Sequence, residues 1–135
     1  MAAFLATICL VTAAPALAQE AAWSGRLRCE PVPGTTQGVL NTPFRLTVSG
    51  TTARYERDVL TASGQTSGNV EQGRGTVSAD GMVRLEGGAS GRGFSYTSQY
   101  QGRLTGTAAT LEGWQDWNSR DSQSRRPCTV TLQRN

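Results

Sequence analysis

The sequence predicts an all-β domain of about eight antiparallel strands, arranged as an up-and-down meander that closes into a small β-barrel. Three observations support this prediction. Apolar and polar residues alternate with a period of two, short turn-forming joints separate the alternating segments, and one cysteine stands near each end of the domain. A β-sandwich is the alternative, because two stacked sheets would also bring the first and last strands together.

The alternation defines the strands in chain order. In "WSGRLRCE" (residues 23–30), Trp23, Leu27 and Cys29 share one face, and charged residues occupy the other. The same pattern follows in "PFRLTVS" and "ARYERDV", although Arg57 breaks it by falling on the face of Tyr55. The remaining predicted strands cover residues 71–78, 82–87, 94–104, 109–117 and 127–133.

The joints between these segments are short and rich in glycine, serine and threonine, which favours sequential strands as neighbours. Asp80-Gly81 is a strong hairpin signal. Within the strands, glycines predict sharp bends of a strongly coiled sheet. The predicted joints are residues 49–52, 61–68, 87–93 and 105–108, and the mid-strand glycines are residues 25, 73, 75, 102 and 113.

The first residues predict an export signal. An apolar run from Phe4 to about Ala14 is broken by Pro15 and followed by Ala16-Leu17-Ala18, a small-x-small pattern that signal peptidase accepts. We therefore expect a signal peptide over residues 1–18, a single domain over residues 19–135, and a periplasmic or secreted protein.

Two other interpretations of these residues are weaker. A membrane anchor would need roughly 20 apolar residues to span a bilayer, and this run is shorter. A lipoprotein site at Cys9 is disfavoured because the bulky Ile8 precedes it and few apolar residues stand before it.

Export leaves two cysteines, Cys29 and Cys128, which most simply form one disulfide in an oxidising compartment. Both point inward by the alternation, one in the first strand and one in the last. A disulfide requires the two α-carbons to lie within about 7 Å, so these strands must be close. A metal site or a catalytic thiol is the alternative, but the chain contains no histidine to support either.

Charge and composition disfavour several function classes. The net charge is +3, and the thirteen basic residues, all arginine, are interleaved with ten carboxylates. A nucleic-acid surface would be denser and more localised. Outward positions carry charged residues such as Arg26, Arg28, Arg84 and Glu86, which lipid would not tolerate. We expect a soluble protein, a monomer, with no nucleic-acid partner and no membrane insertion.

Catalysis is also disfavoured. Without histidine or lysine the chain has no imidazole base, Schiff-base amine or Ser-His triad, and bonded thiols supply no nucleophile. We expect no metal and no cofactor. A carboxylate pair could hydrolyse a glycoside, but the strand acids are assigned to outward positions: Glu56, Asp58, Glu71, Glu86, Glu112 and Asp116.

The segment "GWQDWNSRDSQSRRPC" (residues 113–128) is one candidate binding region. If Leu111 faces inward, so does Trp117, while Trp114 faces outward on a charged strand. Arg120, Arg125 and Arg126 supply planar donors suited to carboxylate, sulfate or phosphate groups. In the purely structural interpretation, the 118–126 loop covers Trp114 and Trp117 plugs a barrel end.

Tyr96 and Tyr100 raise the same question inside the barrel. They share an inward face with Ser98, and their hydroxyls could provide hydrogen-bonding groups in the wall of a small cavity. The alternative is that they are packed core residues, since barrels of this size are usually filled by their own side chains.

The predicted architecture resembles lipocalin- and avidin-like barrels and small exported bacterial inhibitor barrels in shape. Lipocalins carry Gly-x-Trp near the start, whereas "AWSGRLRC" places Trp23 before Gly25, so no motif residue can be transferred. Because a shared shape does not establish function, the resemblance identifies no family.

Two functions are expected. The first is a non-enzymatic protein that binds a small, glycan-like or anionic ligand at one barrel end and the 114–126 region. The second is an interaction protein that inserts the long loop of residues 30–42 into the cleft of an envelope or secreted hydrolase. For this second function the binding partner is a protein and not a small molecule or a glycan.

Overall fold

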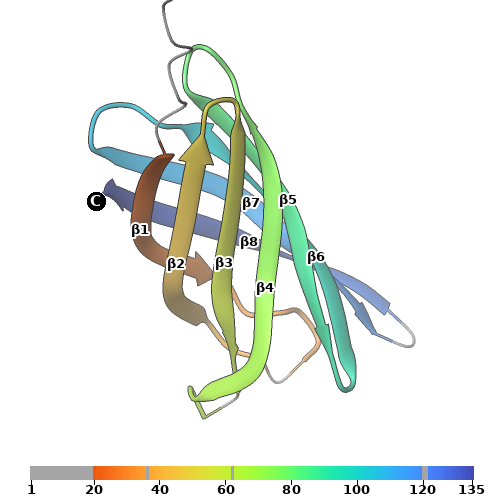
Figure 1. Cartoon of the computed structure of the whole chain (residues 1–135). Coiled ribbons are helices and arrows are strands. Elements are labelled where there is room, and N and C mark those ends of the chain that lie inside the picture. Colours follow the sequence, from red (N-terminus) through yellow and green to blue (C-terminus); the bar gives the residue numbers. More distant parts are fainter. Residues whose placement is uncertain (1–19, 36, 62, 120–121) are drawn as a thin grey trace, which may run out of the picture.

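The computed structural model describes residues 20–35, 37–61, 63–119 and 122–135 and confirms the predicted closed β-barrel. In the described part, eight antiparallel strands follow one another around the wall in chain order (Figure 1). They are β1 (Glu20–Cys29), β2 (Leu40–Ser49), β3 (Thr52–Leu60), β4 (Thr66–Val77), β5 (Met82–Gly91), β6 (Phe94–Arg103), β7 (Ala108–Ser119) and β8 (Ser122–Arg134).

The predicted signal peptide, residues 1–18, lies outside the described residues. Among the residues described, no helix has the length and apolar character needed to cross a bilayer. Arg26, Arg28, Arg84 and Glu86, which the alternation assigned to outward strand positions, are exposed on the outer surface.

The barrel closes where β1 pairs with β8. Their antiparallel register runs from Trp23 opposite Arg134 to Cys29 opposite Cys128. At that last position the two cysteines form the predicted disulfide, which joins residues 99 apart in sequence. Because a continuous ladder runs around the whole wall, the β-sandwich alternative is wrong.

The inward faces fill the barrel with side chains. Leu27, Leu46, Leu85, Leu111 and Val130 are fully buried in one apolar cluster. The rings of Phe44 and Tyr55 stack with centroids 4.9 Å apart, and Tyr100 packs edge-on against both, at 5.8 and 5.5 Å. At this level the interior is packed core.

The mid-strand glycines allow the sheet to coil this tightly. A Cβ built at Gly25 would overlap the backbone carbonyl of Thr131 on β8, and one at Gly113 would overlap that of Gln99 on β6. Both glycines occupy inward positions, Gly25 opposite Leu132 and Gly113 opposite Tyr100. Only hydrogen fits there, so each glycine allows the neighbouring backbone to approach closely.

Several predicted joints are wrong in extent. Most of the predicted 118–126 loop belongs to β7 and β8, which run to Ser119 and from Ser122, and the predicted 30–42 loop already gives way to β2 at Leu40. β4 begins at Thr66 and β5 continues to Gly91, so parts of the 61–68 and 87–93 segments belong to long hairpins. Gly87 and Gly88 pair with Ser98 and Thr97 of β6. Ladder hydrogen bonds need only backbone groups, so a glycine-rich composition does not end a strand when the partner backbone is close.

Reduction of the disulfide should lower stability. The link constrains a loop of 99 residues, for which chain entropy gives about 4–5 kcal/mol of stabilisation. We expect a Cys29→Ala/Cys128→Ala variant, and the wild type in reductant, to melt at a lower temperature in calorimetry. An unchanged melting temperature in both would show that the cross-link does not stabilise the barrel.

Candidate functional site

Among the described residues, three charged side chains lie inside the barrel. Arg57 on β3, Glu71 on β4 and Arg126 on β8 are 1%, 0% and 2% exposed. The assignment of Glu71 to an outward position is therefore wrong. Its side chain shares the inward face with Gly73 and Gly75, whose lack of side chains left that face without a readable apolar pattern.

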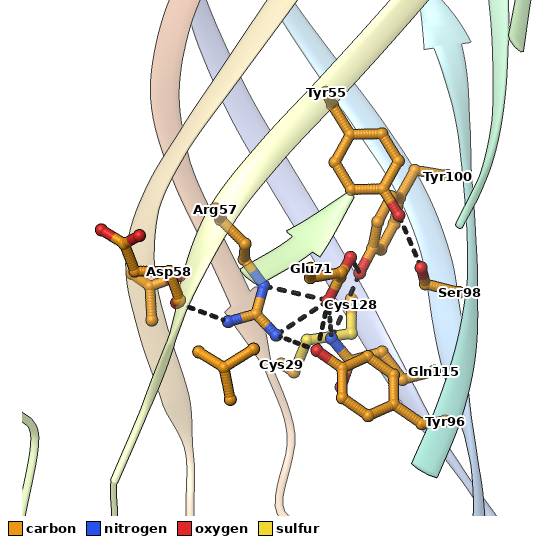
Figure 2. A network of polar contacts seen from close by, with 12 residues as sticks. Cys29, Tyr55, Arg57, Asp58, Glu71, Tyr96, Ser98, Tyr100, Gln115 and Cys128 are labelled. Carbon is orange, nitrogen blue, oxygen red and sulfur yellow. Dashed lines mark hydrogen bonds and ion pairs between the residues drawn. A yellow bond between two sulfur atoms is a disulfide. The ribbon is translucent and has the colours of Figure 1, made fainter. Parts of the chain in front are cut away.

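Glu71 is the centre of a buried hydrogen-bond network (Figure 2). Its Oε1 accepts from Arg57 Nε at 3.0 Å and lies 2.8 Å from Arg57 Nη2, which forms a buried ion pair. The same oxygen accepts from the Tyr96 hydroxyl at 2.7 Å and Gln115 Nε2 at 3.0 Å. The Tyr100 hydroxyl donates to Oε2 at 2.9 Å. Four side chains from three strands, β3, β6 and β7, thus meet at one carboxylate of β4.

Burial fixes the protonation states in this network. Desolvation, with the Glu71 carboxylate nearby, raises the pKa of Tyr96 and Tyr100 far above the usual value, so both hydroxyls remain donors. For Arg57, burial is the largest single effect and lowers the pKa, but the Glu71 carboxylate and the Tyr96 and Tyr100 side chains together raise it, and the net shift is upward. The guanidinium stays charged.

Gln115 connects this network to the end of the barrel. Its amide nitrogen donates to Glu71, and its carbonyl Oε1 accepts from Arg126 Nε at 2.9 Å and from Trp117 Nε1 at 3.1 Å. Because each end of the amide can serve only one of these roles, Glu71 fixes the orientation of Gln115. Gln115 in turn positions Arg126 and Trp117.

Arg126 and Trp117 line a pocket of about 240 Å³ at the barrel end that carries the 30–42 loop; we call it the mouth pocket. Tyr96 and Trp117 stack there with ring centroids 4.5 Å apart, and Phe94 lies 6.0 Å from Trp117. The Arg126 guanidinium lies 5.3 Å from the centre of the Trp117 ring. The other lining residues are Gln37, Leu40, Arg57, Val59, Leu60, Thr61 and Ser67.

Arg126 is a buried cation with no counter-charge among the residues that the structure describes. Its contacts are the Gln115 carbonyl, a long hydrogen bond of 3.5 Å to the Glu30 backbone carbonyl, and the Trp117 ring, and it forms no ion pair with any described residue. Burial lowers its pKa, and the nearby Arg57 lowers it further. Because Glu71 neutralises Arg57, the described interior carries one excess positive charge.

The structure separates the residues of the 113–128 candidate region. Trp117 faces the interior and Trp114 the outer surface, as the alternation predicts. Arg125 and Arg126 were predicted in the 118–126 loop but lie on β8, where Arg126 faces inward and Arg125 outward. Arg125 lies 4.4 Å from the Trp114 ring and holds Asp116 through two hydrogen bonds, of 2.7 and 3.0 Å. The indole nitrogen of Trp114 is buried without a hydrogen-bond partner in the described structure. Arg120 lies outside the described residues.

The two candidate tyrosines have different positions. Tyr100 is packed between Phe44 and Tyr55 in the core, whereas Tyr96 lines the mouth pocket. Sequence reasoning did not select Arg57, Glu71, Gln115 or Phe94 as site residues. The position of Arg57 on the face of Tyr55 was the local signal of a charged group in the interior.

The 30–42 loop folds back against the barrel end. Val32 is buried, the Glu30 amide donates to the Pro127 carbonyl at 3.0 Å, and Ser124 Oγ donates to the Pro33 carbonyl at 3.3 Å. Thr36 is outside the described residues. Val39, near the end of the loop, is 54% exposed.

No protein-family model matches the chain, and no curated protein matches it significantly. Within the part of the chain that the structure describes, no three histidine, cysteine, aspartate or glutamate side chains are grouped as a metal ion would require. The chemistry of the site therefore has to be inferred from its own residues.

The tyrosines should make the fold sensitive to alkaline pH. Burial raises the pKa of Tyr55, Tyr96 and Tyr100 above the ordinary value of 10.0. The unfolded chain loses these protons near pH 10 and the native chain keeps them, so stability is full below that pH and falls above it. The slope reaches about 4 kcal/mol per pH unit.

Chemical denaturation at rising pH, followed by tyrosinate absorbance and near-ultraviolet circular dichroism, checks this expectation. Tyrosinate absorbance should appear together with loss of the native dichroism. The three tyrosines of the chain are all buried, so none of them ionises at its ordinary pH while the fold is intact. Tyrosinate formation at its ordinary pH in a protein with native dichroism would contradict the buried network.

Removing the partner of Arg57 and removing Arg126 itself should have different effects on stability. Glu71→Gln leaves Arg57 unpaired and should cost about 3–5 kcal/mol, whereas Arg126→Met removes a charge that has no partner and should be nearly neutral or stabilising. Urea unfolding measures both free energies. A cost for Arg126→Met as large as that of Glu71→Gln would show that Arg126 is structurally required.

Proposed function

We propose that this protein is an exported, soluble, non-enzymatic barrel that binds a small anionic ligand in its mouth pocket. The observation that carries the proposal is Arg126, which is buried at the pocket wall without a counter-ion among the described residues. Trp117 and Tyr96 form the adjoining aromatic wall.

The energetic reason is the cost of an uncompensated charge. An ion removed from water loses several kcal/mol of solvation, which only a partner charge and hydrogen bonds recover. Arg126 has no such partner among the described residues, and its contacts there are two carbonyl oxygens and an aromatic ring. An anion in the pocket would supply the missing charge. Local costs of this kind are expected at functional sites.

Binding is favoured over catalysis by how the polar groups are used. Glu71, the buried carboxylate of the described interior, accepts hydrogen bonds from four side chains and neutralises Arg57. An acid held in this way is poorly suited to donate or accept a proton in a reaction. We assign it a positioning role.

Export and solubility are supported by separate features. The first 18 residues have the pattern of a cleavable signal peptide, and a disulfide suits an oxidising compartment. Charged side chains cover the outer strand positions. These features support a periplasmic or secreted site of action.

The expected result is that anions bind and depend on Arg126. Isothermal titration of the mature chain with acetate, glucuronate, sulfate and phosphate should give saturable binding of at least one of them. Arg126→Gln should abolish it, because the pocket loses its excess charge. Arg125→Gln is the matched control, because Arg125 is adjacent to Arg126 in sequence but its side chain lies outside the barrel, against Trp114. Equal loss in both variants would count against the mouth pocket.

The inhibitor function retains one observation in its favour. The 30–42 loop is anchored to the barrel by Val32 and its hydrogen bonds and leaves Val39 exposed, as a rigid inserted loop would. If no anion binds and the mature chain captures a hydrolase from culture fluid, with capture lost in Val39→Asp, this second function replaces the first.

A further inference from the structure

We infer that the ligand of the mouth pocket is a monocarboxylate with a small, flat apolar body, such as an aromatic acid of one ring. This inference rests on the proposed function and specifies its ligand class. It follows from the charge, the donor geometry, the walls and the size of the pocket.

The charge of the site calls for a single negative charge. Arg57 reaches the pocket, but its Nε and Nη2 contact Glu71, its Nη2 also contacts the Tyr96 oxygen, and its Nη1 donates to the Asp58 carbonyl. Arg57 is thus both neutralised and occupied. Arg126 alone supplies an excess charge in the described lining. The second charge of a dianion would find no excess positive charge among the described lining residues.

The donors of Arg126 select a planar acceptor. Its Nε is held by Gln115, and its Nη1 has only the 3.5 Å contact with Glu30. No hydrogen bond of Nη2 to a described residue is found, so the terminal edge of the guanidinium is available. That edge presents two parallel N–H groups, which match the two oxygens of a carboxylate.

The walls next to this charge are aromatic and aliphatic. Tyr96 and Trp117 form a stack, and Phe94 lies 6.3 Å from Tyr96 and 6.0 Å from Trp117. Leu40, Val59 and Leu60 complete the apolar lining. A flat ring can lie against such a wall, and its burial adds affinity that a bare anion lacks.

The size of the pocket sets the upper limit of the ligand. Its volume is about 240 Å³, below the roughly 300–1,000 Å³ of pockets that hold drug-sized ligands. The packed rings of Phe44, Tyr55 and Tyr100 prevent deeper entry into the barrel. One ring with its carboxylate is a suitable occupant, whereas a long acyl chain or an oligosaccharide is too large.

A panel of matched probes tests the inference on the mature chain. Titration calorimetry with benzoate, benzamide, acetate and phenyl phosphate separates charge, ring and head-group shape. We expect benzoate to bind best. Benzamide should bind about tenfold more weakly or worse, which is the factor that charge-assisted hydrogen bonding supplies. Acetate should also bind at least about tenfold more weakly because it buries no ring.

Variants of Arg126 identify the contact. Arg126→Gln should reduce benzoate affinity to that of benzamide and leave benzamide affinity unchanged. Arg126→Lys keeps the positive charge but lacks the two parallel N–H groups of the guanidinium, and it should give an intermediate affinity. Arg125→Gln should bind benzoate as the wild type does. Near-ultraviolet circular dichroism and the melting temperature establish that each variant is folded.

Each outcome separates the inference from the function on which it rests. If phenyl phosphate, sulfate or phosphate binds more tightly than benzoate and needs Arg126, the pocket is an anion site and the carboxylate class is wrong. If acetate equals benzoate, the flat apolar body is wrong. If none of the anions binds, the proposed function and the inference both fail.

Discussion

The carboxylate of Glu71 is the interaction on which the interior of this barrel depends. It neutralises Arg57, accepts hydrogen bonds from two tyrosine hydroxyls and holds the amide of Gln115 in one orientation. Buried polar groups are tolerated only when they are satisfied, and a complete network specifies one arrangement of the side chains around it. The polar end of the barrel is therefore ordered by one residue of β4.

This network divides the interior into two regions. On one side, leucines and the rings of Phe44 and Tyr55 form a packed apolar core. On the other, Gln115, which the network holds in one orientation, positions Trp117 and Arg126 at the mouth pocket by accepting a hydrogen bond from each. The apolar part supplies stability by burial, while the arginine at the end of the network has no charged partner among the described residues.

The sequence predicted the barrel because its main determinants are local. The period of two placed Trp114 outward and Trp117 inward, and the inward cysteines required the first and last strands to be neighbours. The polar interior could not be predicted in the same way. Gln115 meets Glu71 across 44 residues of sequence, so no local pattern links them. The opposite orientations of the adjacent Arg125 and Arg126 were not predicted, because both were assigned to the 118–126 loop and not to a strand.

Closure between the chain ends also affects how the molecule must fold. The β1–β8 ladder joins residues 23–29 to 128–134, so the wall is complete only when nearly the entire polypeptide is present. Contacts this distant are entropically costly to form early, which places the barrel among slowly folding, high-contact-order topologies. A fragment lacking either terminal strand would leave two unpaired edges, and such edges recruit other chains into aggregates.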